Sequence, residues 1–175
     1  MASKFKNQGV TLIELIVGIA IISIITSIAV PSFQSMLLNS QIRNAAESVA
    51  NGLQKARGEA VSRNTNVTFV LGAAATGTQS SWTVNVVNPA STIASRDSSE
   101  GSVNVTRTAL PATATTVTFN NLGGVVANAD ATATLSQIDF YAVGSNRNLR
   151  ITIGGGGNTK MCDPNLASGS SPRAC

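Results

Sequence analysis

The stretch Val10–Val30, VTLIELIVGIAIISIITSIAV, decides the fold of this chain. It is apolar along its length apart from one charge, Glu14. At about 1.5 Å per residue such a run spans about 30 Å as a helix, which is the thickness of the hydrocarbon core of a bilayer. Lys4 and Lys6 precede the run, and a basic flank predicts a cytoplasmic N-terminus with everything after Val30 exported. The sequence therefore predicts one membrane helix followed by an exported domain.

Three interpretations compete for this segment. An ordinary signal peptide has a basic start, an apolar core and a small-x-small cleavage site, and Ser27-Ile28-Ala29 fits such a site. A plain membrane anchor is the second interpretation. Neither explains Glu14, because a carboxylate in hydrocarbon is costly unless it finds a partner.

The third interpretation accounts for the charge. The string GVTLIEL at residues 9–15 resembles the processing site of type IV prepilins. In that family a prepilin peptidase cuts after the glycine and methylates the new N-terminus, so the resemblance implies cleavage between Gly9 and Val10. It also implies that Glu14 serves filament assembly by pairing with the N-terminal amine of a neighbouring subunit. Such a pairing is physically reasonable, because an opposite charge and hydrogen bonds make a buried charge tolerable.

Two further positions bear on this resemblance. Pilins frequently have phenylalanine as the first mature residue, and here that residue is Val10. Pro31 ends the apolar run where pilins often carry a proline that bends the helix. Beyond Pro31, apolar residues recur at spacings of three and four, so we expect one long helix from about Val10 to about Arg63. The expected buried stripe is Leu38, Ile42, Ala45, Ala46, Val49, Leu53, Ala56 and Ala60.

After residue 63 the hydrophobic period changes to two, which predicts a β-rich head. The expected strands are Val67–Leu71, Trp82–Val87, Ser102–Arg107, Thr115–Asn120, Ser136–Ala142, Leu149–Ile153 and Thr159–Cys162. Stretches rich in Gly, Ala, Ser and Asn at 72–81, 88–101 and 127–135 are expected loops. The fold class is α+β: a pilin-like arrangement of one long helix packed on a β-rich head.

The sequence therefore predicts four segments. Residues 1–9 form a cytoplasmic leader that is removed, 10–30 cross the membrane, 31–63 continue the helix amphipathically, and 64–175 form a periplasmic head. The resemblance then narrows to the GspH/FimT family of pseudopilins and minor pilins. It rests on LQKARGEAVSRNTNVT at 53–68, SWTV at 81–84, TVTFNNLGGVV at 116–126 and the closing segment from Arg150 to Cys175.

Composition argues against an enzyme. The chain contains no histidine, which removes the commonest general base and the commonest metal ligand. Its acidic side chains are scattered, and no catalytic pair or calcium-binding loop is visible. GGGGNTK at 154–160 lacks the order of a phosphate-binding loop and predicts a hairpin turn instead. We therefore expect no catalytic residues, no metal and no cofactor.

Two features of the C-terminal end are candidate sites. Cys162 and Cys175 form an even pair in an exported chain, which predicts a disulfide. The candidate cations for binding nucleic acid are Arg147, Arg150, Lys160 and Arg173. Some FimT-type proteins are implicated in DNA uptake through a basic C-terminal G-R-x-R motif. This chain has RNLR at 147–150 and no such motif near its end, so a solvated basic face is the alternative.

The leading interpretation is a minor pilin of a type IV pilus that helps to initiate or cap the filament. The alternatives are pseudopilin H of the type II secretion system and a DNA-binding competence pilin. The expected partners are other pilins or pseudopilins, the prepilin peptidase and the inner membrane, with nucleic acid as a further candidate. The expected location is the inner membrane, in a single pass with a periplasmic head, and then the filament.

Overall fold

The computed structural model describes residues 10–72 and 80–175 of the chain. The leader 1–9, with Gly9, and most of the expected loop 72–81 lie outside the described residues. A single helix, α1, covers Leu12–Arg63 and confirms the expected long helix. Its first turn is capped by Thr11, whose side chain accepts a hydrogen bond from the Glu14 amide at 3.3 Å. It ends at Asn64, which adopts the left-handed conformation typical of a helix C-cap.

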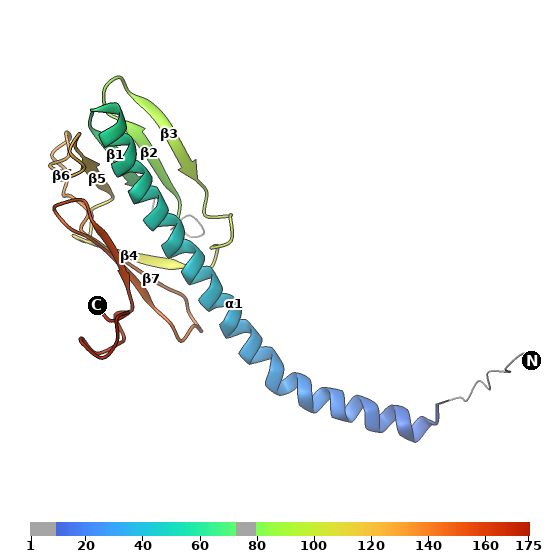
Figure 1. Cartoon of the computed structure of the whole chain (residues 1–175). Helices are drawn as coiled ribbons and strands as arrows, with labels where there is room; N and C mark the ends of the chain where they lie inside the picture. Colours follow the sequence, from blue (N-terminus) through green and yellow to red (C-terminus); the bar gives the residue numbers. More distant parts are fainter. Residues whose placement is uncertain (1–9, 73–79) are drawn as a thin grey trace, which may run out of the picture.

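The helix has two halves with different surroundings. No residue from Leu12 to Gln41 is buried, whereas Ile42 and the rest of the expected stripe after it are buried in the head. Figure 1 shows the exposed blue half projecting from the head and curving away from the line of the packed half. Pro31 lies inside the helix. Because proline has no amide hydrogen, it removes one hydrogen bond of the helix there, which favours a bend in this half.

The head contains two antiparallel sheets, and the packed half of α1 contacts strands of both (Figure 1). The first sheet has the order β3-β2-β1-β5-β6, formed by Ser91–Arg96, Trp82–Val86, Val67–Leu71, Thr116–Phe119 and Val125–Val126. The second sheet has the order β4-β7-β8-β9, formed by Thr106–Leu110, Gln137–Tyr141, Leu149–Ile153 and Thr159–Cys162. Strands β3, β4, β6 and β9 are therefore the edge strands.

Three expectations about the strands were wrong. The strand expected at Ser102–Arg107 begins at Thr106, because residues 102–105 form a turn in which the Val105 amide donates to the Ser102 carbonyl at 3.1 Å. The buried Ser102 hydroxyl also donates to the Ser98 carbonyl, which favours this turn over a strand. Strand β3 lies inside the expected loop 88–101, and β6 was not among the expected strands. Both are edge strands with no alternation of buried and exposed residues to reveal them.

The helix packs closely on the first sheet at one small residue. A side-chain carbon added at Gly52 would lie 2.7 Å from the ring of Phe69 and 3.0 Å from the ring of Trp82. The indole nitrogen of Trp82 donates to the Ser48 hydroxyl at 2.8 Å, one helical turn away from Gly52. A buried indole N–H needs such a partner, so this bond fixes the strand against the helix.

The two sheets meet at the end of the head where α1 ends. The Val125 amide of β6 donates to the Gly155 carbonyl in the β8–β9 hairpin at 2.9 Å. The Arg57 side chain of α1 donates to the Gly123 carbonyl at 3.1 Å. Gly157 is buried at the same place, beside Gly123. The helix, the first sheet and the hairpin of the second sheet are thereby joined at one contact.

Candidate functional site

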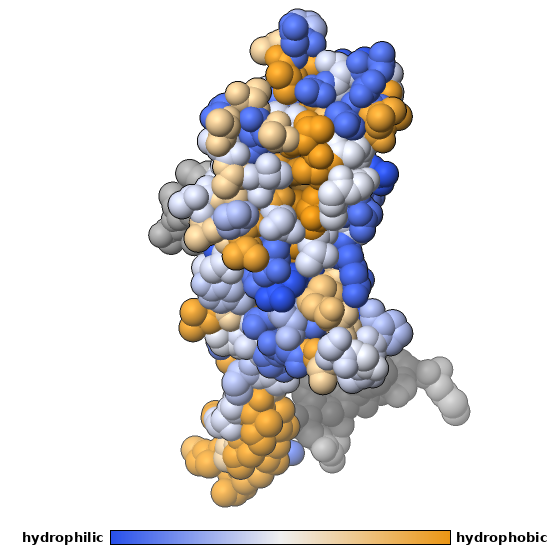
Figure 2. All heavy atoms as spheres, turned by 90° about the vertical axis from the view of Figure 1, so that its left-hand side faces the viewer, coloured by the Kyte–Doolittle hydropathy of each residue, from blue (hydrophilic) through white to orange (hydrophobic). Residues whose placement is uncertain are grey.

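The exposed half of α1 is the first candidate site. Its apolar side chains from Leu12 to Val30 are about half exposed or more, and α1 is long and apolar enough to cross a membrane by length and composition. Figure 2 shows these residues as an orange segment that protrudes below a head of mixed hydropathy. The carboxylate of Glu14 makes no ion pair with any residue that the structure describes. The segment therefore offers an apolar surface and one unpartnered charge.

Hydroxyl groups inside this run do not break its apolar character. Ser23 and Thr26 donate to the carbonyls of the residues four positions earlier at 2.8 and 2.9 Å, and Ser27 donates to the Ile24 carbonyl at 2.7 Å. Because each hydroxyl is satisfied within the helix, it needs no water or outside partner. Glu14 is the one charged side chain of the run, and its carboxylate has no ion-pair partner among the described residues.

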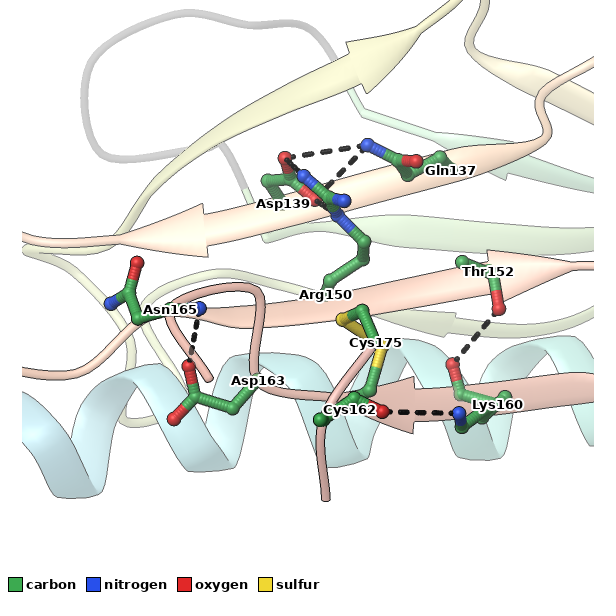
Figure 3. The surroundings of a disulfide bond; sticks show 10 residues. Gln137, Asp139, Arg150, Thr152, Lys160, Cys162, Asp163, Asn165 and Cys175 are labelled. Carbon is green, nitrogen blue, oxygen red and sulfur yellow. Dashed lines mark hydrogen bonds and ion pairs between the residues drawn. A yellow bond between two sulfur atoms is a disulfide. The ribbon is translucent and has the colours of Figure 1, made fainter. Parts of the chain in front are cut away.

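The C-terminal tail is the second candidate site. The structure joins Cys162, at the end of β9, to Cys175, so the tail folds back over the second sheet (Figure 3). The Asp163 amide donates to the Arg173 carbonyl at 2.6 Å, and Asp163 and Ala174 form a parallel β-bridge. The ammonium group of Lys160 donates to the Ala174 carbonyl at 3.1 Å. The disulfide thus fixes a tail that would otherwise leave β9.

Removing the disulfide should free this tail without unfolding the head. We expect the Cys162→Ser, Cys175→Ser double variant to keep its sheets, because the main chain of β9 pairs with β8 and not with the tail. Closing a loop of this size stabilises a protein by about 3 kcal/mol at most. Hydrogen exchange of the detergent-solubilised chain should speed up over 163–175 and stay unchanged over 137–153. Equal acceleration in both segments would contradict this expectation.

The four candidate cations are not gathered on one surface. Arg150 donates to both carboxylate oxygens of Asp139, at 2.7 and 2.8 Å, and this hydrogen bonding raises the pKa of Arg150 (Figure 3). Arg150 shares a face of the sheet with Cys162, its register partner. Lys160 lies diagonally from Arg150 and is engaged with the tail. Arg147 and Arg173 instead line one hollow beside α1. Neither side chain makes an ion pair or hydrogen bond with any described residue.

Arg147 and Arg173 line a hollow of about 350 Å³ between the packed half of α1 and the end of β9. Arg43, on the helix, lines the same hollow, and sequence reasoning did not select it. Arg43 pairs with Glu47 one turn later at 2.6 Å, and the hydrogen bond to Glu47 raises the pKa of Arg43. We call this hollow the arginine pocket. No sequence signal connects Arg43 to it, because the contact depends on how the helix crosses β9.

The described residues contain no group of three or more histidine, cysteine, aspartate or glutamate side chains placed to hold a metal ion. The hollows described on the head are open at the surface, and the one that contains two carboxylates, Glu47 and Asp163, also contains three arginines.

Comparisons with known proteins agree with this arrangement. Residues 45–160 match the family model described as type II transport protein GspH. Residues 4–30 match the model of the prokaryotic N-terminal methylation motif, which contains both Gly9 and Glu14. A sequence search of curated proteins finds no match.

Two solved structures share the fold. Both are crystal structures of the type IV minor pilin FimU of Pseudomonas aeruginosa strain PAO1, in different crystal forms. The first has a TM-score of 0.51 at 21% identity and covers 78% of this chain and 96% of that chain. The second has a TM-score of 0.50 at 22% identity and covers 76% of this chain and 98% of that chain. At this identity the likeness establishes the shared fold.

Proposed function

The chain belongs to the GspH family of type IV pilin-like proteins, and we propose that it is a minor pilin that helps to initiate or cap a type IV pilus. The observation that carries the proposal is α1 itself. One continuous helix exposes an apolar half with a single carboxylate and anchors its other half in the head. A subunit built this way can rest in a membrane and later pack its apolar half against the helices of other subunits.

We place the four segments of the chain in the cell as follows. The leader 1–9 is cytoplasmic and is removed, residues 10–30 cross the inner membrane, 31–63 continue the helix, and 64–175 face the periplasm. The basic residues Lys4 and Lys6 before the apolar run support this orientation. The disulfide at the C-terminal end supports an oxidising compartment for the head. The partners in this proposal are the prepilin peptidase and other pilins.

Processing should occur between Gly9 and Val10. Intact-mass measurement of the membrane-extracted protein should show the loss of residues 1–9 and the gain of one methyl group. The Gly9→Leu variant should keep its full length, because the resemblance to type IV prepilins implies a cut after glycine. A mature N-terminus at Val30 would establish an ordinary signal peptide instead.

A pseudopilin of the type II secretion system is the alternative, and the description of the matching family favours it. The C-terminal disulfide favours the pilus, because it resembles the minor-pilin branch of the family. Deleting the gene separates the two. Loss of surface pili with normal protein secretion supports the pilus, whereas loss of secretion with normal pili supports the pseudopilin. Mass spectrometry of sheared filaments should detect the chain in the first case.

A role in DNA uptake has less support in the arrangement of the cations. Contact of four cations with phosphates requires them to share a surface, but Arg150 and Lys160 are engaged on one face while Arg147 and Arg173 lie at the arginine pocket. Two free arginines predict a log–log salt slope near −2 for duplex DNA, about half the slope expected for four. DNA uptake is therefore the alternative with the least support.

A further inference from the structure

Strand β9, Thr159–Cys162, has one paired side and one free side. It is the last strand of its sheet and pairs with β8 alone. The Gly154 amide donates to the Asn158 carbonyl at 2.9 Å, and antiparallel pairs alternate between bonded and non-bonded positions. The bonded positions of β9 are therefore Lys160 and Cys162. The backbone groups of Thr159 and Met161 point to the free side, where they bond no other described residue.

One backbone hydrogen bond already forms on the free side of β9, just after the strand ends. The next outward-pointing amide after Met161 is that of Asp163, and it donates to the Arg173 carbonyl of the tail. Asp163 and Ala174 form a parallel β-bridge there. Backbone pairing on this side is thus sterically possible at Asp163. The tail leaves the same edge uncovered at Met161 and Thr159.

Three hollows follow this edge between β9 and α1. The arginine pocket lies at the Cys162 end. The second hollow, of about 280 Å³, lies beside Met161 and Lys160 and reaches Ala50 and Ile151. The third lies beside Gly157 and Thr159 and reaches Val61. A strand added to an edge places alternate side chains on one face, so successive hollows along the edge provide places for those side chains.

Cations line both ends of this row of hollows, but at the Gly157 end Arg57 donates to the Gly123 carbonyl. At the Cys162 end Arg43 is paired with Glu47, and Asp163 accepts a hydrogen bond from the Asn165 amide at 2.9 Å. Arg147 and Arg173 have no such partner among the described residues. A guanidinium binds a carboxylate well in a partly enclosed hollow, because both groups then make charge-assisted hydrogen bonds. An acidic group of a partner fits this end.

We propose that the free edge of β9 is a docking site for an extended segment of another protein. The segment adds to the sheet antiparallel to β9. Its main chain bonds Thr159 and Met161, and its small apolar side chains enter the hollows. An acidic side chain at its N-terminal end pairs with Arg147 and Arg173. Keeping an edge strand short is one way in which proteins protect it from pairing with other chains. The row of hollows and the two unpaired arginines distinguish β9 from such an edge.

The probe is the peptide acetyl-Asp-Thr-Val-Thr-Val-amide, which places Asp and both Val side chains on one face of a strand, titrated into the processed full chain in detergent. We expect saturable binding, together with slower hydrogen exchange over Thr159–Cys162. The peptide with the reversed sequence and the peptide with lysine in place of aspartate should each bind at least about tenfold more weakly. Methylating one alternate set of peptide amides should abolish binding, and methylating the other set should not, because only one set faces the edge.

Variants of the protein test whether binding depends on the two arginines of the pocket or only on the net charge of the chain. Arg147→Glu and Arg173→Glu should each weaken binding at least about tenfold, whereas Lys55→Glu, on an exposed turn of α1, should not change it. Absence of saturable binding at millimolar peptide would overturn the proposal. So would equal binding of all the peptides. Displacement of the peptide by duplex DNA at lower concentration, with a salt slope near −2, would assign the arginines to nucleic acid instead.

Discussion

Replacing Glu14 with alanine should leave the protein in the membrane and remove it from filaments. The apolar run of α1 becomes more hydrophobic without the carboxylate, so insertion and processing should be normal. The variant lacks the group that we infer pairs with the N-terminal amine of a neighbour. An amine left unpaired among packed apolar helices is costly, because its charge is then buried without a partner. We expect at least about tenfold less of the variant in sheared filaments, at equal abundance in membranes.

The control is Glu100→Ala in the head. Glu100 is exposed, and its ion pair with Arg96 at 3.4 Å resembles a surface pair that contributes little to stability. This variant removes one negative charge from the chain, as Glu14→Ala does, and should enter filaments normally. Glu14→Gln tests the charge more closely, since it keeps the size and polarity of the side chain. Normal assembly of both Glu14 variants would refute the role assigned to this carboxylate.

The helix was predictable because its signals are local. The apolar run, the three- and four-residue spacing from Leu38 to Ala60 and the polar cluster after Ser62 can each be read within a few residues. All members of the expected stripe are buried except Leu38, which is half-buried. Strands such as β1 and β8 were predicted to the residue, because buried and intermediate positions alternate along them.

The edge strand β3 and the positions of the arginines could not be predicted, because they depend on contacts between distant segments. The edge strand β3, STIASR, has one partner and no buried residue, so it carries no alternating pattern. Arg147 lies at the arginine pocket whereas Arg150 pairs with Asp139 of the neighbouring strand, although only two residues separate them in the sequence. The meeting of Arg43 with Arg147 depends on the path of α1 across β9. None of these contacts leaves a signal in a short stretch of sequence.

The contact between Gly157 and Gly123 allows the stability of the head to be tested by a single substitution. Gly157 lies in the β8–β9 hairpin with φ of +76°, a conformation that costs a residue with a side chain about 1–2 kcal/mol. An added carbon there would also lie 1.9 Å from the Gly123 carbonyl oxygen, which accepts the hydrogen bond from Arg57. Backbone blocks this space, so the hairpin must move away from the first sheet. Gly155 lies two residues earlier in the same turn with nothing within 4 Å of the added carbon.

Gly157→Ala should therefore destabilise the head by about 2–4 kcal/mol, through the strained backbone and the displaced contact together. For a domain of this size that is a decrease of roughly 10 °C or more in Tm. The single tryptophan, Trp82, packs between the first sheet and α1, so its fluorescence during heating or urea titration reports unfolding of the head. Gly155→Ala is the matched control and should change the free energy of unfolding by less than about 0.5 kcal/mol. Equal stability of the two variants would show that the hairpin does not hold the two sheets together at Gly123.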